Sequence, residues 1–77
     1  MITSLENKEI KKYLKLKKKK YRDLEKLFLV EGEHLIKEAE KSNSLVKVIL
    51  TEDKELETNK EILYVTHEIM KKLSNLD

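Results

Sequence analysis

The only glycine of this chain, Gly32, stands between a short apolar run and an amphipathic segment, and this arrangement constrains the fold most. Residues 28–30 are Phe, Leu and Val, which are typical of a strand that is covered on both faces. Gly32 can adopt a positive φ, or admit another backbone closely, at low steric cost. Beyond it, apolar residues recur at helical spacing with charged residues between them. The pattern predicts a buried strand over residues 27–31, a sharp turn, and a helix over about 33–41.

The remaining periodicity predicts two more strands and two more helices. These elements are a helix over residues 8–20, a turn or short helical overrun over 21–26, strands over 45–51 and 62–65, and a helix over 67–74. A turn at 42–44 ends the helix after Gly32, and the acidic residues 52–60 form a loop or one helical turn. Asn7 and Thr66 precede the first and last helices, and both are residue types that cap helix N-termini.

This alternation of apolar strands and amphipathic helices indicates a small α/β domain. We expect a three-layer sandwich in which a three-stranded, partly parallel sheet has helices on both faces. Three strands are few for a sheet with two buried faces, so we expect a final strand from sequence that follows this chain. The residues expected in the core include Ile10, Tyr13, Leu14, Phe28, Ile69, Met70 and Leu73, whereas Leu16 lies off the apolar side of its helix.

Charge is distributed unevenly along the chain, although the net charge of all 77 residues is only +2. Residues 1–22 hold nine basic groups against Glu6 and Glu9, a net charge of +7, and residues 23–77 have a net charge of −5. The basic groups are Lys8, Lys11, Lys12, Lys15, Lys17, Lys18, Lys19, Lys20 and Arg22. A basic arm on an acidic body indicates a polyanionic partner, with nucleic acid the first candidate. The alternative is a solvated, lysine-rich helix without a partner.

Composition excludes several classes of site. The chain has no cysteine, which rules out disulfides, thiolate catalysis and cysteine-based zinc sites and fits the reducing cytoplasm. Residues 1–7 lack the apolar core of a signal peptide and no apolar run approaches about 20 residues, so we expect a cytoplasmic chain without a membrane partner. The two histidines, His34 and His67, have no further ligands at metal-binding spacing, so no metal is expected. No nucleophile–base pair is present, so we expect no catalytic residue in this chain itself.

Three segments, taken in order, resemble a known family. Residues 2–7 (Ile-Thr-Ser-Leu-Glu-Asn) are similar to an I-x-S-x-x-N segment, and residues 19–22 (Lys-Lys-Tyr-Arg) to a basic cluster that ends in arginine. Residues 28–32 with 35–39 are similar to an F-x-V-E-G motif and the helix after it, and a weaker match covers 66–74. These motifs are those of the SpoU/TrmH-family RNA 2′-O-ribose methyltransferases.

The resemblance implies an RNA substrate-binding domain with the fold of certain kink-turn-binding ribosomal proteins. In this family a separate C-terminal domain with a knotted α/β fold binds S-adenosylmethionine and carries the catalytic motifs, including N-x-G-N-x-G-x-x-x-R, which this chain lacks. Residues 1–77 are therefore expected to be the isolated N-terminal domain of a longer methyltransferase, without a cofactor of its own. The parent protein is expected to form a homodimer through the missing domain and to modify ribosomal RNA rather than transfer RNA.

The predicted RNA-binding residues come from the basic arm and from the turn at Gly32. They are Asn7, Lys11, Lys18, Lys19, Lys20, Arg22, Glu31, Gly32 and His34. Lysine and arginine neutralise phosphates, and the planar guanidinium of Arg22 can hold a phosphate through two donors.

Several of these residues have a structural alternative. Asn7 either caps the first helix or contacts RNA, and Tyr21 either stacks on a base or packs in the core. Glu31 either contacts RNA or accepts hydrogen bonds at the turn, from backbone N–H groups, Arg22 or a lysine. His34 either touches RNA or faces solvent. For the whole chain, the second hypothesis is a protein-interaction or dimerisation module that uses an open sheet edge.

Overall fold

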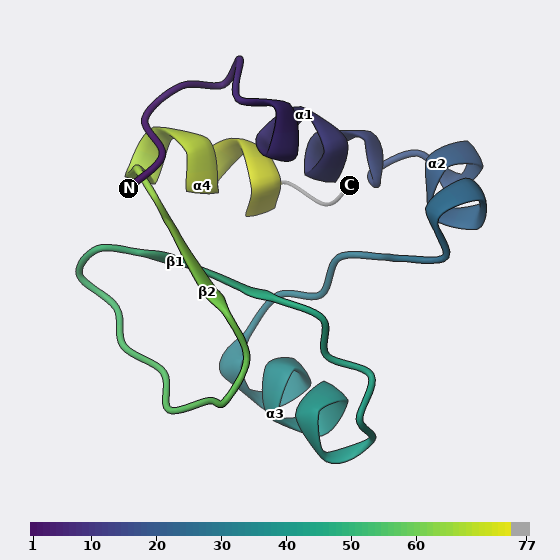
Figure 1. The fold of residues 1–77 in the computed structure, drawn as a ribbon, viewed down its shortest axis with the longest axis vertical. Helices are drawn as coiled ribbons and strands as arrows, with labels where there is room; N and C mark the ends of the chain where they lie inside the picture. Colours follow the sequence, from purple (N-terminus) through teal and green to yellow (C-terminus); the bar gives the residue numbers. More distant parts are fainter. Residues whose placement is uncertain (75–77) are drawn as a thin grey trace.

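The computed structural model describes residues 1–74, which form four helices and two strands (Figure 1). In chain order these elements are α1 (Lys8–Lys15), α2 (Lys19–Glu25), α3 (Glu33–Lys41), β1 (Val48–Thr51), β2 (Ile62–Val65) and α4 (His67–Ser74). Figure 1 shows α1 and α4 side by side on one side of the two strands and α3 on the other. The prediction of a small α/β domain is confirmed. Its likeness to kink-turn-binding ribosomal proteins stays a prediction.

The sheet has two parallel strands, and the N-terminal segment extends it by one bridge. β1 pairs with β2 in the register Val48 to Ile62 through Thr51 to Val65. Ile2 lies beside Val65: its N–H donates to the carbonyl of Tyr64 at 2.8 Å, and its carbonyl accepts from the N–H of Thr66 at 3.1 Å. The N-terminus therefore runs along β2, in a place that the sequence did not indicate.

The predicted strand over 27–31 is wrong. Among the described residues, no backbone hydrogen bond is made by residues 28–31, and the Phe28 side chain is 71% exposed rather than in the core. An apolar run becomes a strand only where another strand offers it a hydrogen-bonding edge. Here β1 and β2 pair with each other and Ile2 lies beside Val65, whereas residues 27–31 pair with neither strand and only connect α2 to α3.

The turn at Gly32 is confirmed, and its cause is backbone conformation. Gly32 has a φ of +105°, which side-chain-bearing residues rarely adopt, and it is the N-cap of α3. A Cβ placed on it would meet nothing within 4 Å, so no other part of the described chain approaches it closely.

The core lies where α1, β2 and α4 meet. Ile10, Val65, Ile69 and Leu73 are buried together, and partly buried side chains surround them: Ile2, Leu5, Tyr13, Leu14, Ile49, Leu63 and Met70. The apolar sides predicted for the first and last helices are therefore confirmed, and Tyr13 and Met70 pack against this core. Both predicted caps are present as well: the N–H groups of Glu9 and Ile10 donate to Asn7 Oδ1 at 2.9 and 3.2 Å, and that of Ile69 to Thr66 Oγ1 at 3.3 Å.

The single helix predicted over 8–20 is interrupted. α1 ends at Lys15, residues 16–18 form a turn, and α2 begins after Lys18, whose backbone is extended (φ −101°, ψ 134°). Leu16 is only 3% exposed, contrary to its prediction as an off-stripe residue. Leu16 is the C-cap of α1 and keeps a right-handed helical backbone (φ −66°, ψ −7°), so the chain leaves the α1 axis only after it. Four consecutive lysines repel one another in a continued helix, which favours the break at this place.

The other predicted elements lie close to their observed bounds. Helices α3 and α4 span the predicted residues, β2 spans 62–65 as predicted, and β1 is shorter than predicted because it begins at Val48. Val46 is accordingly 64% exposed. Residues 52–60 form a loop without a helical turn, and none of the helices within residues 1–74 has the length and apolar character needed to cross a membrane.

Candidate nucleic-acid interface

The basic residues of the N-terminal arm lie on α1, on α2 and on the turn that joins them. Three of the lysines form exposed ion pairs: Lys11 with Glu6 at 2.8 Å, Lys12 with Glu25 at 3.7 Å, and Lys19 with Asp23 at 2.8 Å. Exposed pairs of this kind contribute about 0–1 kcal/mol, so an incoming phosphate can replace the carboxylate at little cost. Lys17 instead donates to the carbonyl of Lys72 and so ties the end of α1 to α4.

Apart from Lys17, four lysines of this arm make no ion pair with any described residue. They are Lys8, Lys15, Lys18 and Lys20, and all four are exposed. Lys18 and Lys20 belong to the predicted set, whereas Lys8 and Lys15 were outside it. Their unpaired ammonium groups are the strongest candidates for phosphate contacts on this surface.

Arg22 has a structural task. Its Nη1 donates to the carbonyls of Leu16 and Lys17 at 2.9 and 2.8 Å, two carbonyls exposed where α1 ends. The side chain thus fastens α2 to the end of α1 and stabilises the turn between them. This contact uses one of the two terminal nitrogens that the predicted two-donor grip on phosphate requires, and the predicted pairing of Glu31 with Arg22 is absent among residues 1–74.

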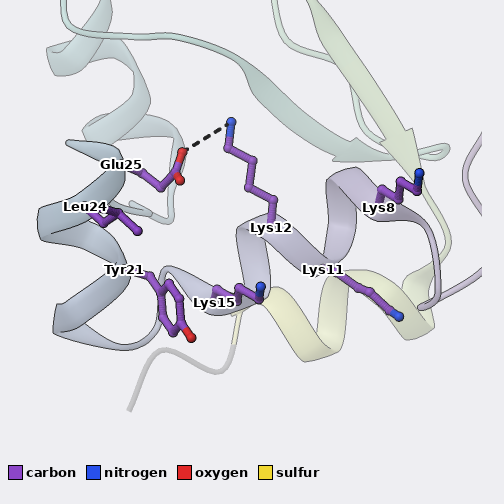
Figure 2. Close-up of a pocket in the computed structure, with 7 residues that line it drawn as sticks. All are labelled: Lys8, Lys11, Lys12, Lys15, Tyr21, Leu24 and Glu25. Carbon is purple, nitrogen blue, oxygen red and sulfur yellow. Dashed lines mark ion pairs between the residues drawn. The ribbon is translucent and has the colours of Figure 1, made fainter.

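A pocket of about 350 Å³ lies between α1 and α2 (Figure 2). Its lining residues are Lys8, Lys11, Lys12, Lys15, Tyr21, Leu24 and Glu25. Figure 2 shows Tyr21, Leu24 and Glu25 on the side of α2 that faces α1, with Lys12 reaching toward Glu25. The ammonium groups of Lys15 and Lys20 lie 5.3 and 5.6 Å from the centre of the Tyr21 ring, within the range of cation–π attraction. A basic groove with an aromatic ring in it is a common form of nucleic-acid surface.

Glu31, Gly32 and His34 are not brought together with the lysines. They lie at the start of α3, which Figure 1 places across the strands from α1, and all three are exposed. Within residues 1–74, Glu31 makes no ion pair and its carboxylate accepts no hydrogen bond. The nine predicted RNA-binding residues therefore form two separate groups.

A second pocket, of about 320 Å³, lies at the carboxyl ends of β1 and β2. Thr51 Oγ1 donates to Asp53 Oδ1 at 2.7 Å, which lowers the pKa of that carboxyl, and His67 Nε2 lies 3.2 Å from the same oxygen. The His67 side chain is 74% exposed and faces solvent. Among residues 1–74, no three acidic or histidine side chains are grouped so that they could hold a metal ion.

Sequence reasoning missed the cluster that holds α1 against β1. Lys47 and Tyr13 both donate to Glu9 Oε2, and Glu61 Oε1 lies 3.5 Å from Lys47 Nζ. Hydrogen bonds from Lys47 and then from Tyr13 lower the pKa of Glu9. Burial, and then the bond to Glu9, raises the pKa of Tyr13, and the bond to Glu9 raises the pKa of Lys47. Glu9 and Lys47 are 38 positions apart, so no local pattern signals this contact.

Glu9→Gln is expected to lower the free energy of unfolding by about 1 kcal/mol at pH 7, because the partly shielded carboxylate has two donors. The folded pKa of Glu9 lies below its ordinary value of 4.5. Its contribution is therefore complete above that pH and is lost as the pH falls through the folded value. Urea unfolding followed by circular dichroism should show a smaller difference in unfolding free energy between the two proteins at pH 3 than at pH 7.

The matched control for this measurement is Glu33→Gln. Glu33 also lies in the first turn of a helix but makes no ion pair with a described residue. Glu33→Gln should change the free energy of unfolding by less than about 0.5 kcal/mol at either pH. A difference between Glu9→Gln and the unmodified chain that persists undiminished at pH 3 would contradict the assignment.

Two comparisons with known proteins bear on this surface. Residues 7–77 match the family model described as MRM3-like substrate binding domain. The chain is also similar to the 23S rRNA (guanosine(2553)-2'-O)-methyltransferase RlmP of Bacillus subtilis (strain 168), with 48% identity over 52 residues. That alignment covers 68% of this chain and 21% of the relative, so the chain spans about a fifth of the relative's length.

Proposed function

Because this chain belongs to the family of MRM3-like substrate binding domains, we propose that it binds RNA as the substrate-recognition domain of a 2′-O-ribose methyltransferase. The resemblance to N-terminal substrate-binding domains of the SpoU/TrmH family is confirmed by the same match and by the 48% identity to RlmP. Ribosomal RNA is the proposed substrate, since the relative carries 23S rRNA in its name.

The observation that carries the RNA-binding proposal is the set of four unpaired lysines on α1, α2 and the turn between them. Lys8, Lys15, Lys18 and Lys20 are exposed and have no carboxylate partner among residues 1–74. Bringing a phosphate to such a group releases counterions without first breaking an ion pair. Contacts of this kind hold RNA in a given register without reading its sequence.

The proposal assigns binding to this chain and chemistry to a separate domain. Residues 1–77 are the RNA-binding domain of a longer methyltransferase, whose catalytic domain binds S-adenosylmethionine and forms the homodimer. S-adenosylmethionine carries a positive sulfonium, and four lysines line the α1–α2 pocket, so this pocket does not suit the cofactor.

The residues at the start of α3 form a second, weaker part of the proposal. Glu31, Gly32 and His34 are exposed on the far side of the strands, so an RNA that reaches them must wrap around the domain or be contacted there by a different segment. Asn7 caps α1, and its Oδ1 already accepts hydrogen bonds from two N–H groups. A contact between Asn7 and RNA would therefore use its amide nitrogen.

A second function, docking onto another protein, is favoured by the exposed apolar side chains outside the core. Phe28, Val46 and Leu35 are 71%, 64% and 49% exposed. Sedimentation at low and high salt separates the two functions. Self-association that high salt leaves intact supports a docking module, whereas a monomer with salt-sensitive RNA binding supports the RNA-binding function.

The RNA-binding function predicts a steep dependence of affinity on salt. Four lysine–phosphate contacts correspond to a slope of about −3 in log affinity against log salt, so affinity should fall about 60-fold between roughly 50 and 200 mM salt. Fluorescence anisotropy with a labelled, structured ribosomal RNA fragment measures this slope. Circular dichroism at both salt concentrations checks that the domain stays folded. Absence of binding at the lower concentration, or an affinity that salt does not change, would refute the function.

A further inference from the structure

Helix α2 presents its apolar side chains to a groove rather than to the core. It contributes no buried residue, and Leu24 is 69% exposed. Tyr21 and Leu24 are three positions apart, so they share one face of the helix, and both line the pocket between α1 and α2 (Figure 2). Apolar surface that a small domain leaves at the edge of a pocket is available to a ligand.

The size and the walls of this pocket suit a planar, anionic ligand. Its volume of about 350 Å³ lies within the range of about 300–1,000 Å³ typical of ligand pockets. One wall is the Tyr21 ring with Leu24 beside it, and the opposite wall is the lysine-bearing side of α1. An unpaired nucleotide has both matching parts, a flat base and a charged phosphate.

The surroundings of the Tyr21 ring support this match. Two ammonium groups, those of Lys15 and Lys20, lie within 6 Å of the ring centre, so the ring is open to charged groups and is not enclosed by apolar side chains. Lysine side chains are flexible and can turn from the ring to the phosphates on either side of a stacked base. Neither lysine has a carboxylate partner among the described residues that would hold it back.

We infer that the pocket between α1 and α2 binds an unpaired nucleotide of RNA, with the base stacked on Tyr21 and the flanking phosphates held by Lys15 and Lys20. This inference rests on the proposed function and makes it more specific. A base in a duplex is stacked between its neighbours and cannot enter the pocket, whereas a base in a loop or a single strand can. The domain therefore prefers single-stranded segments, and the lysines alone account for its binding to duplexes.

The test compares two RNA probes and three variants. The probes are a single-stranded oligouridine of about seven nucleotides, within the usual site sizes of such surfaces, and an RNA duplex of equal length. The variants are Tyr21→Leu, Tyr21→Phe and, as a matched control, Tyr64→Leu. Tyr64 lies on β2 outside the pocket and is 39% exposed. Affinities are measured by fluorescence anisotropy at low salt, and folding is checked by circular dichroism.

We expect Tyr21→Leu to weaken single-strand binding about tenfold and to leave duplex binding within about twofold, because only stacking is removed. Tyr21→Phe, which keeps the ring, should stay within about threefold of the unmodified chain. Equal losses for both probes, or an equal loss in Tyr64→Leu, would overturn the inference. If the unmodified chain binds RNA and Tyr21→Leu changes nothing, the pocket assignment fails alone; if it binds neither probe, the proposed function fails as well.

A measurement on the unmodified chain keeps the inference testable if Tyr21→Leu does not fold. Ring stacking moves the proton resonances of a tyrosine upfield. Nuclear magnetic resonance spectra should therefore show the Tyr21 ring protons shifting as oligouridine is added, while those of Tyr64 remain in place. Unmoved Tyr21 resonances at saturating oligouridine would overturn the inference.

Discussion

Ile69→Ala is expected to lower the free energy of unfolding by about 2–5 kcal/mol, the largest effect of any single substitution proposed for this chain. Ile69 has no exposed surface and lies between Ile10, Val65 and Leu73 at the centre of the core. The substitution removes apolar contacts from three elements at once and leaves a cavity. At about 0.05–0.15 kcal/mol per residue, the whole domain is stable by only about 4–12 kcal/mol, so this single substitution removes a large share of its stability.

Phe28→Ala is the matched control for Ile69→Ala, because it removes a larger side chain from a position that the sequence pattern predicted to be in the core. The Phe28 side chain is 71% exposed, so the expected change is less than about 0.5 kcal/mol. Urea unfolding followed by circular dichroism measures both variants. A loss of several kcal/mol in Phe28→Ala would show that residues 27–31 are buried and would contradict the observed fold.

Replacing Lys15, Lys18 and Lys20 together by glutamine is expected to weaken RNA binding by about 100-fold or more at about 0.1 M salt. Each lost phosphate contact lowers the RNA affinity roughly 5–8-fold at that concentration, because each contact contributes about 0.7–0.9 to the slope of log affinity against log salt. The slope of the variant should therefore fall to about −1. Fluorescence anisotropy over a range of salt concentrations gives both quantities.

The control for this variant removes the same charge elsewhere. Lys41, Lys54 and Lys60, replaced by glutamine, lie at the end of α3 and in the loop after β1, and none of the three forms an ion pair with a described residue. The RNA affinity of this control variant should fall by less than about tenfold, because only the long-range attraction between its charge and the RNA is weakened. Equal losses in the two triple variants would show that net charge, rather than the surface on α1 and α2, governs binding.

Arg22 is left unchanged in this experiment for a structural reason. Its Nη1 holds the carbonyls of Leu16 and Lys17, so replacing it would loosen the junction between α1 and α2. A loss of RNA binding in such a variant would mix a folding effect with a binding effect. The basic residue that stood out in the sequence as the only arginine is therefore the least suitable for testing the interface.

Much of the candidate interface could be predicted from the sequence, because charge is counted without knowing the fold. The basic arm, the family and four of the lysines that bear on the interface were evident from residues 2–22. The pocket between α1 and α2 was not, since it exists only because the predicted helix over 8–20 breaks after Lys15. At that break Leu16 is buried and Arg22 holds the carbonyls of Leu16 and Lys17, and local spacing reveals neither contact.

Several elements whose hydrogen bonds join residues close in sequence could be predicted from that sequence. Asn7 and Thr66 cap their helices, Gly32 turns with a positive φ, and α3 and α4 span the predicted residues, because helix bonds join positions four apart. Which apolar runs pair as strands depends on the tertiary fold. Strand bonds need a partner distant in sequence, so nothing local could show that β1 pairs with β2, that Ile2 takes the place beside β2, and that residues 27–31 remain unpaired.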